Sequence, residues 1–472
     1  MFENFDGTGR KPREQQLEAL RWLEENWDKY KVFGIQGSCG IGKQAIARAV
    51  QLETNAAYIT TENMLVQQAL KTYPEANYLI GRSNYKCSTY PNLSCEDIAL
   101  SKVKHHCTGC KYQDARKRAL SMESTIYNPI SYYYLAQSKK WVIPKVLIVD
   151  EAHKLGSSMM LLSGESFSIA KYNIRPNMSL IEVTEWLAEQ EAKFRLLIAK
   201  APFEKSVYYS TLLHKARRVR QCLLTEPHKY VILYDEGKLH IKPIYPPKEI
   251  KSKILSSSKL ILMSATLFRS DIESLVDGPY GYLDLSSPID KDRRKVILDP
   301  IALNINYKTS PEVIAAWVKK VLRENPNKNT IVHVSYGWSK KLAPLLPGVL
   351  TNTKDTKRSV LKKFKKHGGV WLASGCAEGI DLLGDICRLN VIPILPRANI
   401  EDPIVRKRLS LPGGEVEYEL DILRTVIQQA GRSTRDPSDH SKTVVGDIHL
   451  KRLISKYKDS LPSSFVESLE GV

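Results

Sequence analysis

Residues 37–43 read Gly37-Ser38-Cys39-Gly40-Ile41-Gly42-Lys43. The spacing of Gly, four residues, Gly and Lys is typical of a phosphate-binding loop. The apolar residues 32–35 before it predict a buried strand, and residues 44–50 after it predict a helix. In this context, backbone N–H groups and the helix N-terminus point at phosphate oxygens. We therefore predict that the loop binds a nucleotide, with Lys43 on the terminal phosphates.

The residue after the lysine departs from the usual motif. Position 44 is Gln44, where Ser or Thr normally supplies a hydroxyl to Mg²⁺. A Gln carbonyl oxygen can bind a hard cation, but its reach and geometry differ. The alternative is a glycine-rich turn before an ordinary helix, and the rest of the chain argues against it.

Composition indicates a globular protein with a polyanionic partner. The chain has 472 residues, 43% of them hydrophobic, and a net charge of +19, so we expect two or three domains and a nucleic acid as the leading partner. The alternative is a solvated basic surface without function. No apolar run reaches the length of a membrane span, and residues 1–16 lack the apolar core of a signal peptide. We expect a cytoplasmic, DNA-associated protein without a membrane partner.

A second segment, residues 144–149, contains a continuous apolar run and ends in Asp150-Glu151-Ala152-His153. Such a run predicts a strand buried on both faces. Acidic side chains at its carboxyl end suit nucleotide hydrolysis: Asp150 would hold Mg²⁺ and Glu151 would polarise the attacking water. His153 would couple the site to a neighbouring domain. The alternative is an acidic strand end that caps a helix.

Polar residues flank these two motifs. Arg13 and Gln16 open a predicted helix, and such a pair contacts adenine in many nucleic-acid motor proteins. On the residues alone, a solvated helix face is the better interpretation. Thr60 and Thr61 end another predicted strand, where their hydroxyls would contact a ligand backbone or cap a helix.

Four of the eight cysteines fall close together, at Cys87, Cys95, Cys107 and Cys110. One Cys-x-x-Cys pair with two outlying cysteines fits either a zinc site or a [4Fe–4S] cluster. The segment has too few apolar residues to fold otherwise, so we expect a metal-stapled, basic module. It is a candidate contact for nucleic acid.

Two further regions follow. Residues 156–250 have helical periodicity and a predicted hairpin, and they read as an insertion. From about residue 285, strands and helices alternate, which predicts a second parallel sheet. This unit contains Gln428-Gln429-Ala430-Gly431-Arg432-Ser433-Thr434-Arg435, which we expect to lie on a helix. Arg432 and Arg435 would then share one face and reach a γ-phosphate across a cleft. The alternative is a basic surface helix.

Together these motifs resemble the superfamily 2 helicases of the XPD/DinG group, the iron–sulfur helicases. The resemblance rests on the phosphate loop, the Asp-Glu-Ala-His box, Ser264-Ala265-Thr266, Glu378-Gly379-Ile380-Asp381, Tyr127-Asn128-Pro129, Gly81-Arg82-Ser83-Asn84-Tyr85-Lys86-Cys87 with the later cysteines, and the Gln428–Arg435 motif. The motifs run in family order from residue 13 to residue 435.

The resemblance implies an α/β fold with two RecA-like parallel-sheet motor domains. An iron–sulfur module and a small, mainly helical, arch-like insert would lie on the first. The first motor domain would comprise residues 1–80, 121–155 and 251–284, the iron–sulfur module residues 81–120, the insert residues 156–250 and the second motor domain residues 285–472. The insert is short for an arch, so any ring around a strand would be smaller or open.

The resemblance also implies an activity. ATP would bind between the domains, with Gln428, Arg432, Arg435 and Asp381 completing the site from the second. The family moves 5′ to 3′ on single-stranded DNA and separates duplexes, so we expect single-stranded and forked or tailed duplex DNA as partners, Mg²⁺ and a [4Fe–4S] cluster as cofactors, a monomer, and a role in DNA repair or replication. The competing hypothesis is a non-catalytic nucleic-acid binder on a degenerate helicase fold, supported only by Gln44.

Overall fold

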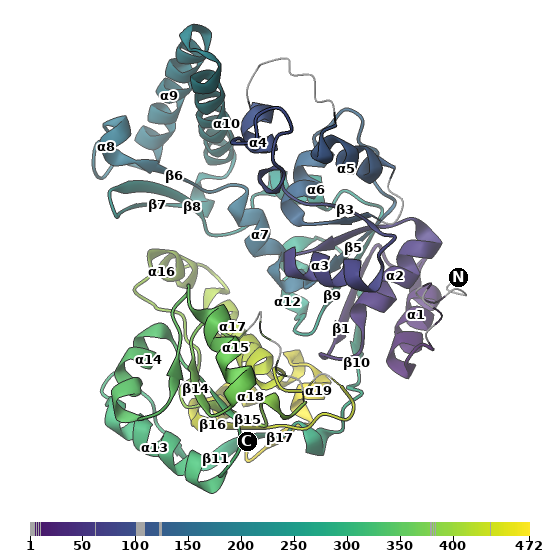
Figure 1. Cartoon of the computed structure of the whole chain (residues 1–472), viewed down its shortest axis with the longest axis vertical. Helices are drawn as coiled ribbons and strands as arrows, with labels where there is room; N and C mark the ends of the chain where they lie inside the picture. Colours follow the sequence, from purple (N-terminus) through teal and green to yellow (C-terminus); the bar gives the residue numbers. More distant parts are fainter. Residues whose placement is uncertain are drawn as a thin grey trace.

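The computed structural model describes residues 5, 7, 9, 11–61, 63–100, 109–121, 125–377, 380, 382, 384–434 and 436–472. Two parallel sheets organise the chain, one in each of two α/β domains (Figure 1). The predicted fold class, two parallel-sheet RecA-like domains, is confirmed.

The first sheet has the strand order β10-β1-β9-β5-β2-β4-β3, and its strands pair in parallel. Its strands are β1 (Val32–Gly37), β2 (Ala57–Thr60), β3 (Asn77–Leu79), β4 (Thr125–Tyr127), β5 (Val146–Asp150), β9 (Lys259–Ser264) and β10 (Tyr280–Leu285). Every residue of β1 and β5 is buried, as expected for strands covered on both faces. Their carboxyl ends place the phosphate loop and the Asp-Glu pair at one edge of the sheet.

Helices cover both faces of this sheet (Figure 1). They are α1 (Glu14–Asn26), α2 (Lys43–Thr54), α3 (Asn63–Thr72), α5 (Lys111–Leu120), α6 (Pro129–Ala136), α7 (Leu155–Leu161), α11 (Lys248–Ile254) and α12 (Arg269–Leu275). Helix α4 (Cys95–Leu100) lies away from the sheet, beside the insert (Figure 1). Two separate clusters of buried apolar side chains flank the sheet, one around Phe33 and Ile35 and the other around Leu147 and Val149.

The insert forms a small unit of its own. A three-stranded antiparallel sheet, in the order β6-β8-β7, supports a pair of long helices that project from the first domain (Figure 1). The elements are β6 (Glu165–Ser168), α8 (Ile169–Tyr172), α9 (Leu180–Lys200), α10 (Phe203–Thr225), β7 (Tyr230–Asp235) and β8 (Lys238–Pro243). Helix α10 packs against α9 and also contacts α4 of the cysteine-containing segment.

The second sheet has the order β13-β14-β12-β15-β16-β11-β17, and its strands also pair in parallel. Its strands are β11 (Val296–Leu303), β12 (Thr330–His333), β13 (Leu350–Thr351), β14 (Val370–Ala373), β15 (Leu389–Ile392), β16 (Lys442–Asp447) and β17 (Leu469–Glu470). Its helices are α13 (Pro311–Glu324), α14 (Tyr336–Leu342), α15 (Lys357–His367), α16 (Pro403–Leu409), α17 (Gly414–Ala430), α18 (His449–Tyr457) and α19 (Ser463–Val466). Among the described helices, none is long and apolar enough to cross a membrane.

Candidate active site

The phosphate loop links β1 to α2 through a tight turn. Gly40 and Gly42 have φ angles of 93° and 81°, in the left-handed region that glycine adopts without strain. At Gly37, an added Cβ atom would lie 2.1 Å from Ile41 Cδ1, so a side chain there would push the loop open. The sequence therefore folds into a compact turn that ends at the N-terminus of α2, as an anion site requires.

Arg13 and Gln16 hold this loop from α1. Gln16 is 5% exposed, its Nε2 donates to the carbonyl oxygens of Ile41 (2.8 Å) and Gly42 (3.3 Å), and its Oε1 accepts from the Arg13 N–H (2.8 Å). The Arg13 guanidinium donates to the Gly40 carbonyl oxygen. The interpretation of this pair as a solvated helix face is therefore wrong for Gln16, because a side-chain amide pinned to backbone is withdrawn from solvent.

The loop approaches the second domain at Cys39. Lys43 Nζ donates to the Gly37 carbonyl oxygen over 3.1 Å, and Gln44 is half-buried one position later. The Ser38 hydroxyl is buried and has no hydrogen-bond partner among the described residues. A Cβ atom added to Gly431 would lie 3.9 Å from Cys39 Sγ. The loop and the second domain therefore meet at this point.

Asp150 and Glu151 have pKa values displaced in opposite directions. Asp150 is 3% exposed, and burial, followed by the charge of Glu151, raises the pKa of Asp150 to about 6 despite Lys43 and a 3.0 Å hydrogen bond from the Tyr58 hydroxyl. Burial also opposes ionisation of Glu151, but the charges of Lys43 and Lys154, together with the hydrogen bond from Ser264, outweigh it and lower the pKa of Glu151. Two carboxyl groups separated in this way suit different roles.

A chain of hydrogen bonds runs from Glu151 across the domain boundary. Ser264 Oγ donates to Glu151 Oε2 (3.2 Å) and lies 2.7 Å from His153 Nδ1. Nε2 of the same imidazole lies 3.1 Å from Gln428 Nε2 in the second domain, and that amide also donates to Thr266 Oγ1 (3.3 Å). Because an amide nitrogen only donates, His153 Nε2 is the acceptor, and Nδ1–H donates to Ser264. The chain has one consistent direction of donation toward Glu151.

The segment after Gln428 is only partly helical. Helix α17 ends at Ala430, and Gly431 is its C-cap, so the expectation that residues 428–435 continue on one helix is wrong. Gly431 has a φ of -78° and a ψ of 6°, so the helix ends there without a left-handed turn. Arg432 is 8% exposed and donates to the carbonyl oxygens of Gln428 (3.1 Å) and Ile380 (3.0 Å). Arg435, Asp381, Glu378 and Gly379 lie outside the described residues.

The sequence did not predict three important side-chain contacts. Arg424 on α17 donates to both carboxylate oxygens of Asp271 on α12 (2.8 and 2.9 Å) and to the Thr266 carbonyl oxygen (2.7 Å). It stands one helical turn before Gln428, on the same face, which is the signal that would have identified it. Tyr58, which binds Asp150, left no comparable signal.

The hydroxyls of Thr60 and Thr61 are both buried and have no hydrogen-bond partner among the described residues. Within the described residues, neither hydroxyl caps α3. A contact with a ligand stays a prediction.

The described cysteines of the predicted metal module are buried. Cys87, Cys95 and Cys110 are each 7–8% exposed, and the Ser88 hydroxyl donates to the Gly109 carbonyl oxygen (3.1 Å), which joins the first cysteine's loop to the last. Cys107 lies outside the described residues. Within the described part of the chain, no group of three or more His, Cys, Asp or Glu side chains converges on a metal position.

Comparisons with known proteins agree with this architecture. Residues 311–468 match the helicase C-terminal domain family, and residues 10–184 match the family described as type III restriction enzyme, res subunit. The chain is similar to the ATP-dependent DNA helicase YoaA of Escherichia coli (strain K12), with 26% identity over 312 residues, 60% of this chain and 48% of YoaA. The chain thus spans about half the length of this curated relative.

Two solved structures share the fold. An XPD helicase superimposes with a TM-score of 0.63 at 16% identity, covering 95% of this chain and 98% of the other. S. tokodaii Xpd4 superimposes with a TM-score of 0.60 at 15% identity, covering 97% and 99%. The predicted resemblance to the XPD/DinG group of superfamily 2 is confirmed.

Proposed function

We propose that this XPD/DinG-like chain is an ATP-dependent DNA helicase that moves 5′ to 3′ along single-stranded DNA. The observation that carries the proposal is the hydrogen-bond chain from Glu151 through Ser264 and His153 to Gln428. It links the predicted catalytic carboxylate to the second domain, so a change at the nucleotide alters the contact between domains. A static nucleotide-binding fold has no need of such a link.

The residues at the loop and at the strand ends have separate roles in hydrolysis. The phosphate loop cradles the phosphates of ATP and Lys43 neutralises the terminal ones. Glu151 remains ionised and polarises the attacking water. Arg432 and Arg435, which belong to the second domain, stabilise negative charge on the transferred phosphoryl group. Gln428 couples the second domain to the phosphoryl group through its contact with His153.

The Asp150 carboxyl fits a divalent cation. Burial raises the pKa of Asp150 to about 6, because too little positive charge lies near the buried carboxylate to stabilise its ionised form. A nearby Mg²⁺ would supply that positive charge. When bound, Mg²⁺ neutralises charge on the β- and γ-phosphates. The Gln44 carbonyl, half-buried beside Lys43, is the candidate replacement for the missing hydroxyl.

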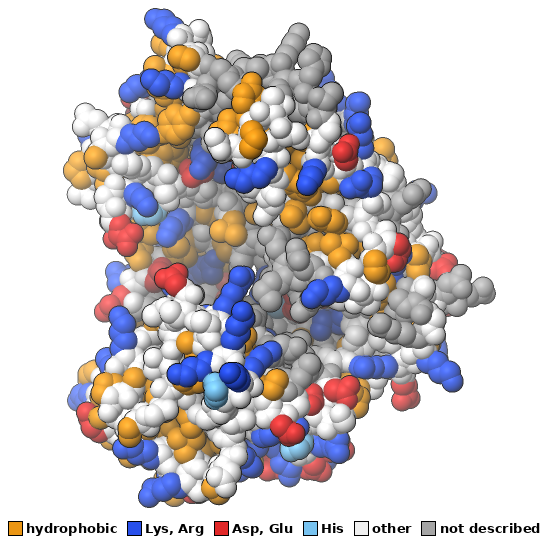
Figure 2. Space-filling view, in the orientation of Figure 1, with side chains coloured by type: hydrophobic (Ala, Val, Ile, Leu, Met, Phe, Trp, Pro, Cys, Tyr) orange, Lys and Arg blue, Asp and Glu red, His pale blue; other side chains and the backbone are white. Residues whose placement is uncertain are grey.

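The proposed strand partner is supported by charge. Helix α15 has Lys or Arg at six of its eleven positions, and Figure 2 shows Lys and Arg side chains gathered over this part of the second domain. Such surfaces bind phosphate backbones with strong salt dependence and little sequence preference. We propose single-stranded and forked or tailed duplex DNA as substrates of a monomeric enzyme.

We further propose a [4Fe–4S] cluster held by Cys87, Cys95, Cys107 and Cys110. The burial of the three described thiols and the link between their loops support it. Protein purified without oxygen should contain about four iron atoms per chain, and Cys95→Ser should lose them together with duplex unwinding. Stoichiometric zinc in place of iron would contradict this proposal.

The test of the helicase is ATP hydrolysis by anaerobically purified protein, with and without single-stranded DNA. Strong stimulation by DNA, abolished in Lys43→Ala, is the expected result. Full DNA-stimulated hydrolysis in Lys43→Ala would overturn the assignment.

Gln44 favours one other candidate function, a nucleic-acid binder that does not hydrolyse ATP. Hydrolysis that is absent in the natural protein but restored in Gln44→Thr would support it.

A further inference from the structure

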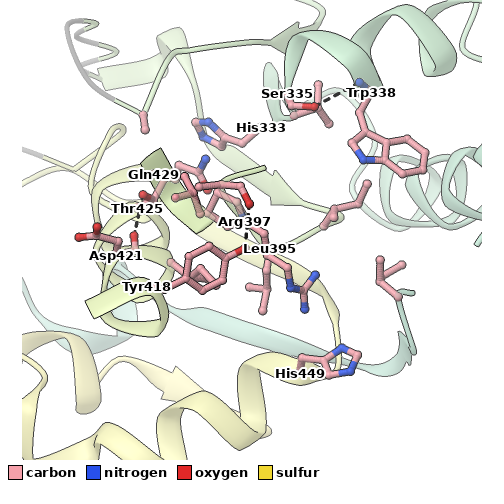
Figure 3. Close-up of a pocket in the computed structure, with 18 of the residues that line it drawn as sticks. His333, Ser335, Trp338, Leu395, Arg397, Tyr418, Asp421, Thr425, Gln429 and His449 are labelled. Atoms are coloured by element: carbon pink, nitrogen blue, oxygen red, sulfur yellow. Dashed lines mark hydrogen bonds between the residues drawn. The ribbon is translucent and has the colours of Figure 1, made fainter. Parts of the chain in front are cut away.

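The second domain contains a cavity that neither the hydrolysis site nor the backbone-binding surface uses. It has a volume of about 830 Å³ and lies at the carboxyl ends of β12, β14 and β15. Side chains of α17, including Tyr418, Thr425 and Gln429, form one side, and Trp338 and His449 lie on the opposite side (Figure 3). A volume of this size and a position at strand ends are typical of a small-molecule site.

Two buried polar groups in the cavity wall lack hydrogen bonds. His333 is 2% exposed, and neither of its ring nitrogens has a hydrogen-bond partner of normal length among the described residues, although Asn390 lies nearby. Gln429 is 7% exposed, and its Oε1 is likewise without a partner. Burial lowers the pKa of His333 to about 3, so the imidazole is neutral and offers one donor and one acceptor. Groups of this kind are costly unless a ligand pairs with them.

Aromatic side chains provide part of the remaining surface, beside Arg, Asp, Glu and aliphatic side chains. Trp338 is half-buried in the wall, and Tyr307 at the rim is 92% exposed. An indole and a phenol offer stacking surfaces to a flat ring, which bind bases without requiring a particular sequence. A purely apolar ligand would leave His333 and Gln429 unpaired. The lining therefore favours a planar heterocycle with hydrogen-bonding edges.

We infer that this cavity binds a nucleobase, stacked by the aromatic wall and hydrogen-bonded at its edge by His333 and Gln429. The base could belong to the DNA strand or to a free nucleotide, and both present the same chemistry. The DNA source rests on the proposed function, whereas the free-nucleotide source does not. In either case the binding goes beyond contact with the phosphate backbone, because it depends on the base.

The cavity shares α17 with the hydrolysis site. Thr425 and Gln429 line the cavity, while their neighbours Arg424 and Gln428 bind the first domain. A base seated against this helix therefore contacts the element that carries the link to Glu151.

The test compares base-bearing and base-free ligands of equal charge. Probes are an oligonucleotide of deoxythymidine, the same phosphodiester chain made of abasic units, and deoxyadenosine monophosphate, the last measured in a Lys43→Ala background to remove the phosphate-loop site. Thr425→Phe fills the cavity from α17. Val416→Phe adds the same ring at a position that is 42% exposed on the same helix and outside the cavity.

The natural protein and Val416→Phe should bind the base-bearing chain roughly tenfold or more tightly than the abasic chain. Thr425→Phe should lose most of this preference and keep its salt-dependent binding to both chains. Loss of mononucleotide binding in Thr425→Phe would identify a free nucleotide as ligand, and loss of only the oligonucleotide preference would identify a base of the strand. Trp338→Leu, which keeps apolar volume but removes the ring, provides a second test if Thr425→Phe does not fold.

The inference would be overturned if Thr425→Phe and Val416→Phe showed the same preference for the base-bearing chain over the abasic chain, and if Thr425→Phe also bound the mononucleotide as tightly as the protein without this substitution. The helicase proposal would survive that result if DNA still stimulated ATP hydrolysis. Conversely, DNA could fail to stimulate ATP hydrolysis while Thr425→Phe still abolished mononucleotide binding. That result would overturn the helicase proposal and leave the cavity assignment in place.

Discussion

Replacing Arg424 with Ala should uncouple the two domains. The guanidinium forms a bidentate pair with Asp271 at 2.8 and 2.9 Å, donates to the Thr266 carbonyl oxygen at 2.7 Å, and lies 4.5 Å from the Phe268 ring centroid. The two charged side chains are only 11% and 15% exposed. Arg424→Ala therefore leaves a largely buried carboxylate without its cation.

The magnitude follows from these contacts. Hydrogen bonds to charged groups contribute roughly 1.5–3 kcal/mol each, so the bidentate pair could contribute about 3–6 kcal/mol. Asp271 retains one hydrogen bond, from the Phe268 N–H at 2.8 Å, and both side chains regain water when the domains separate. We expect a loss near the lower bound, about 3 kcal/mol, which is roughly a 150-fold change in the population of the joined arrangement.

The assay is a double-mutant cycle on DNA-stimulated ATP hydrolysis with Arg424→Ala, Asp271→Ala and the double variant. Each single variant should lose roughly 100-fold in kcat/KM, and the double variant little more than either, giving a coupling energy of about 2–3 kcal/mol. Arg424→Lys, which keeps the charge but not the fork, should lie between. Additive losses, with a coupling energy below about 0.5 kcal/mol, would show that the pair does not join the domains during hydrolysis.

Three smaller perturbations test the nucleotide site. Tyr58→Phe removes a hydrogen bond that lowers the pKa of Asp150, so the decline of ATP hydrolysis as pH falls through about 6 should move to higher pH; an unchanged pH profile would contradict a role for the ionised carboxyl. Gln44→Thr should lower the Mg²⁺ concentration needed for half-maximal hydrolysis, by roughly tenfold if the hydroxyl binds the ion as in other phosphate loops; no change would exclude position 44 from the ion site. Gly42→Ala places a Cβ atom 2.4 Å from Gln16 Nε2 at a φ of 81°, so nucleotide affinity should fall by roughly tenfold or more, measured by equilibrium binding beside Gly348→Ala, which has a similar φ of 80° and open space around it.

The local signals in the sequence were sufficient to predict the two sheets. Residues 32–35 and 146–149 contain no polar side chain because β1 and β5 are covered on both faces, and each run leads into a polar motif at the sheet edge. The same logic failed at Gly431, which lies within a recognisable motif but ends the helix. Motif spacing alone cannot distinguish a helix interior from its C-cap.

Long-range contacts were beyond the reach of local patterns. Arg424 and Asp271 lie 153 positions apart, and either is an ordinary surface residue until the domains are placed together. The cavity is similarly hidden, because its lining comes from separate segments, and His333 reads as the last residue of a buried strand. Only the folded arrangement shows that, among the described residues, neither ring nitrogen forms a hydrogen bond of normal geometry, although Asn390 lies nearby.

Helix α17 explains why the two domains should respond together. Along its 17 residues, a length of about 25 Å, Glu417 accepts a hydrogen bond from Tyr245 beside the insert (2.9 Å), Arg424 binds Asp271, and Gln428 binds His153. These positions are separated by seven and four residues, so they form one stripe on the helix. Because one rigid element carries all three contacts, rotation of the second domain cannot release one without straining the others. A nucleotide-dependent change at Gln428 is therefore transmitted to the insert and to the adjacent cavity face without a separate moving part.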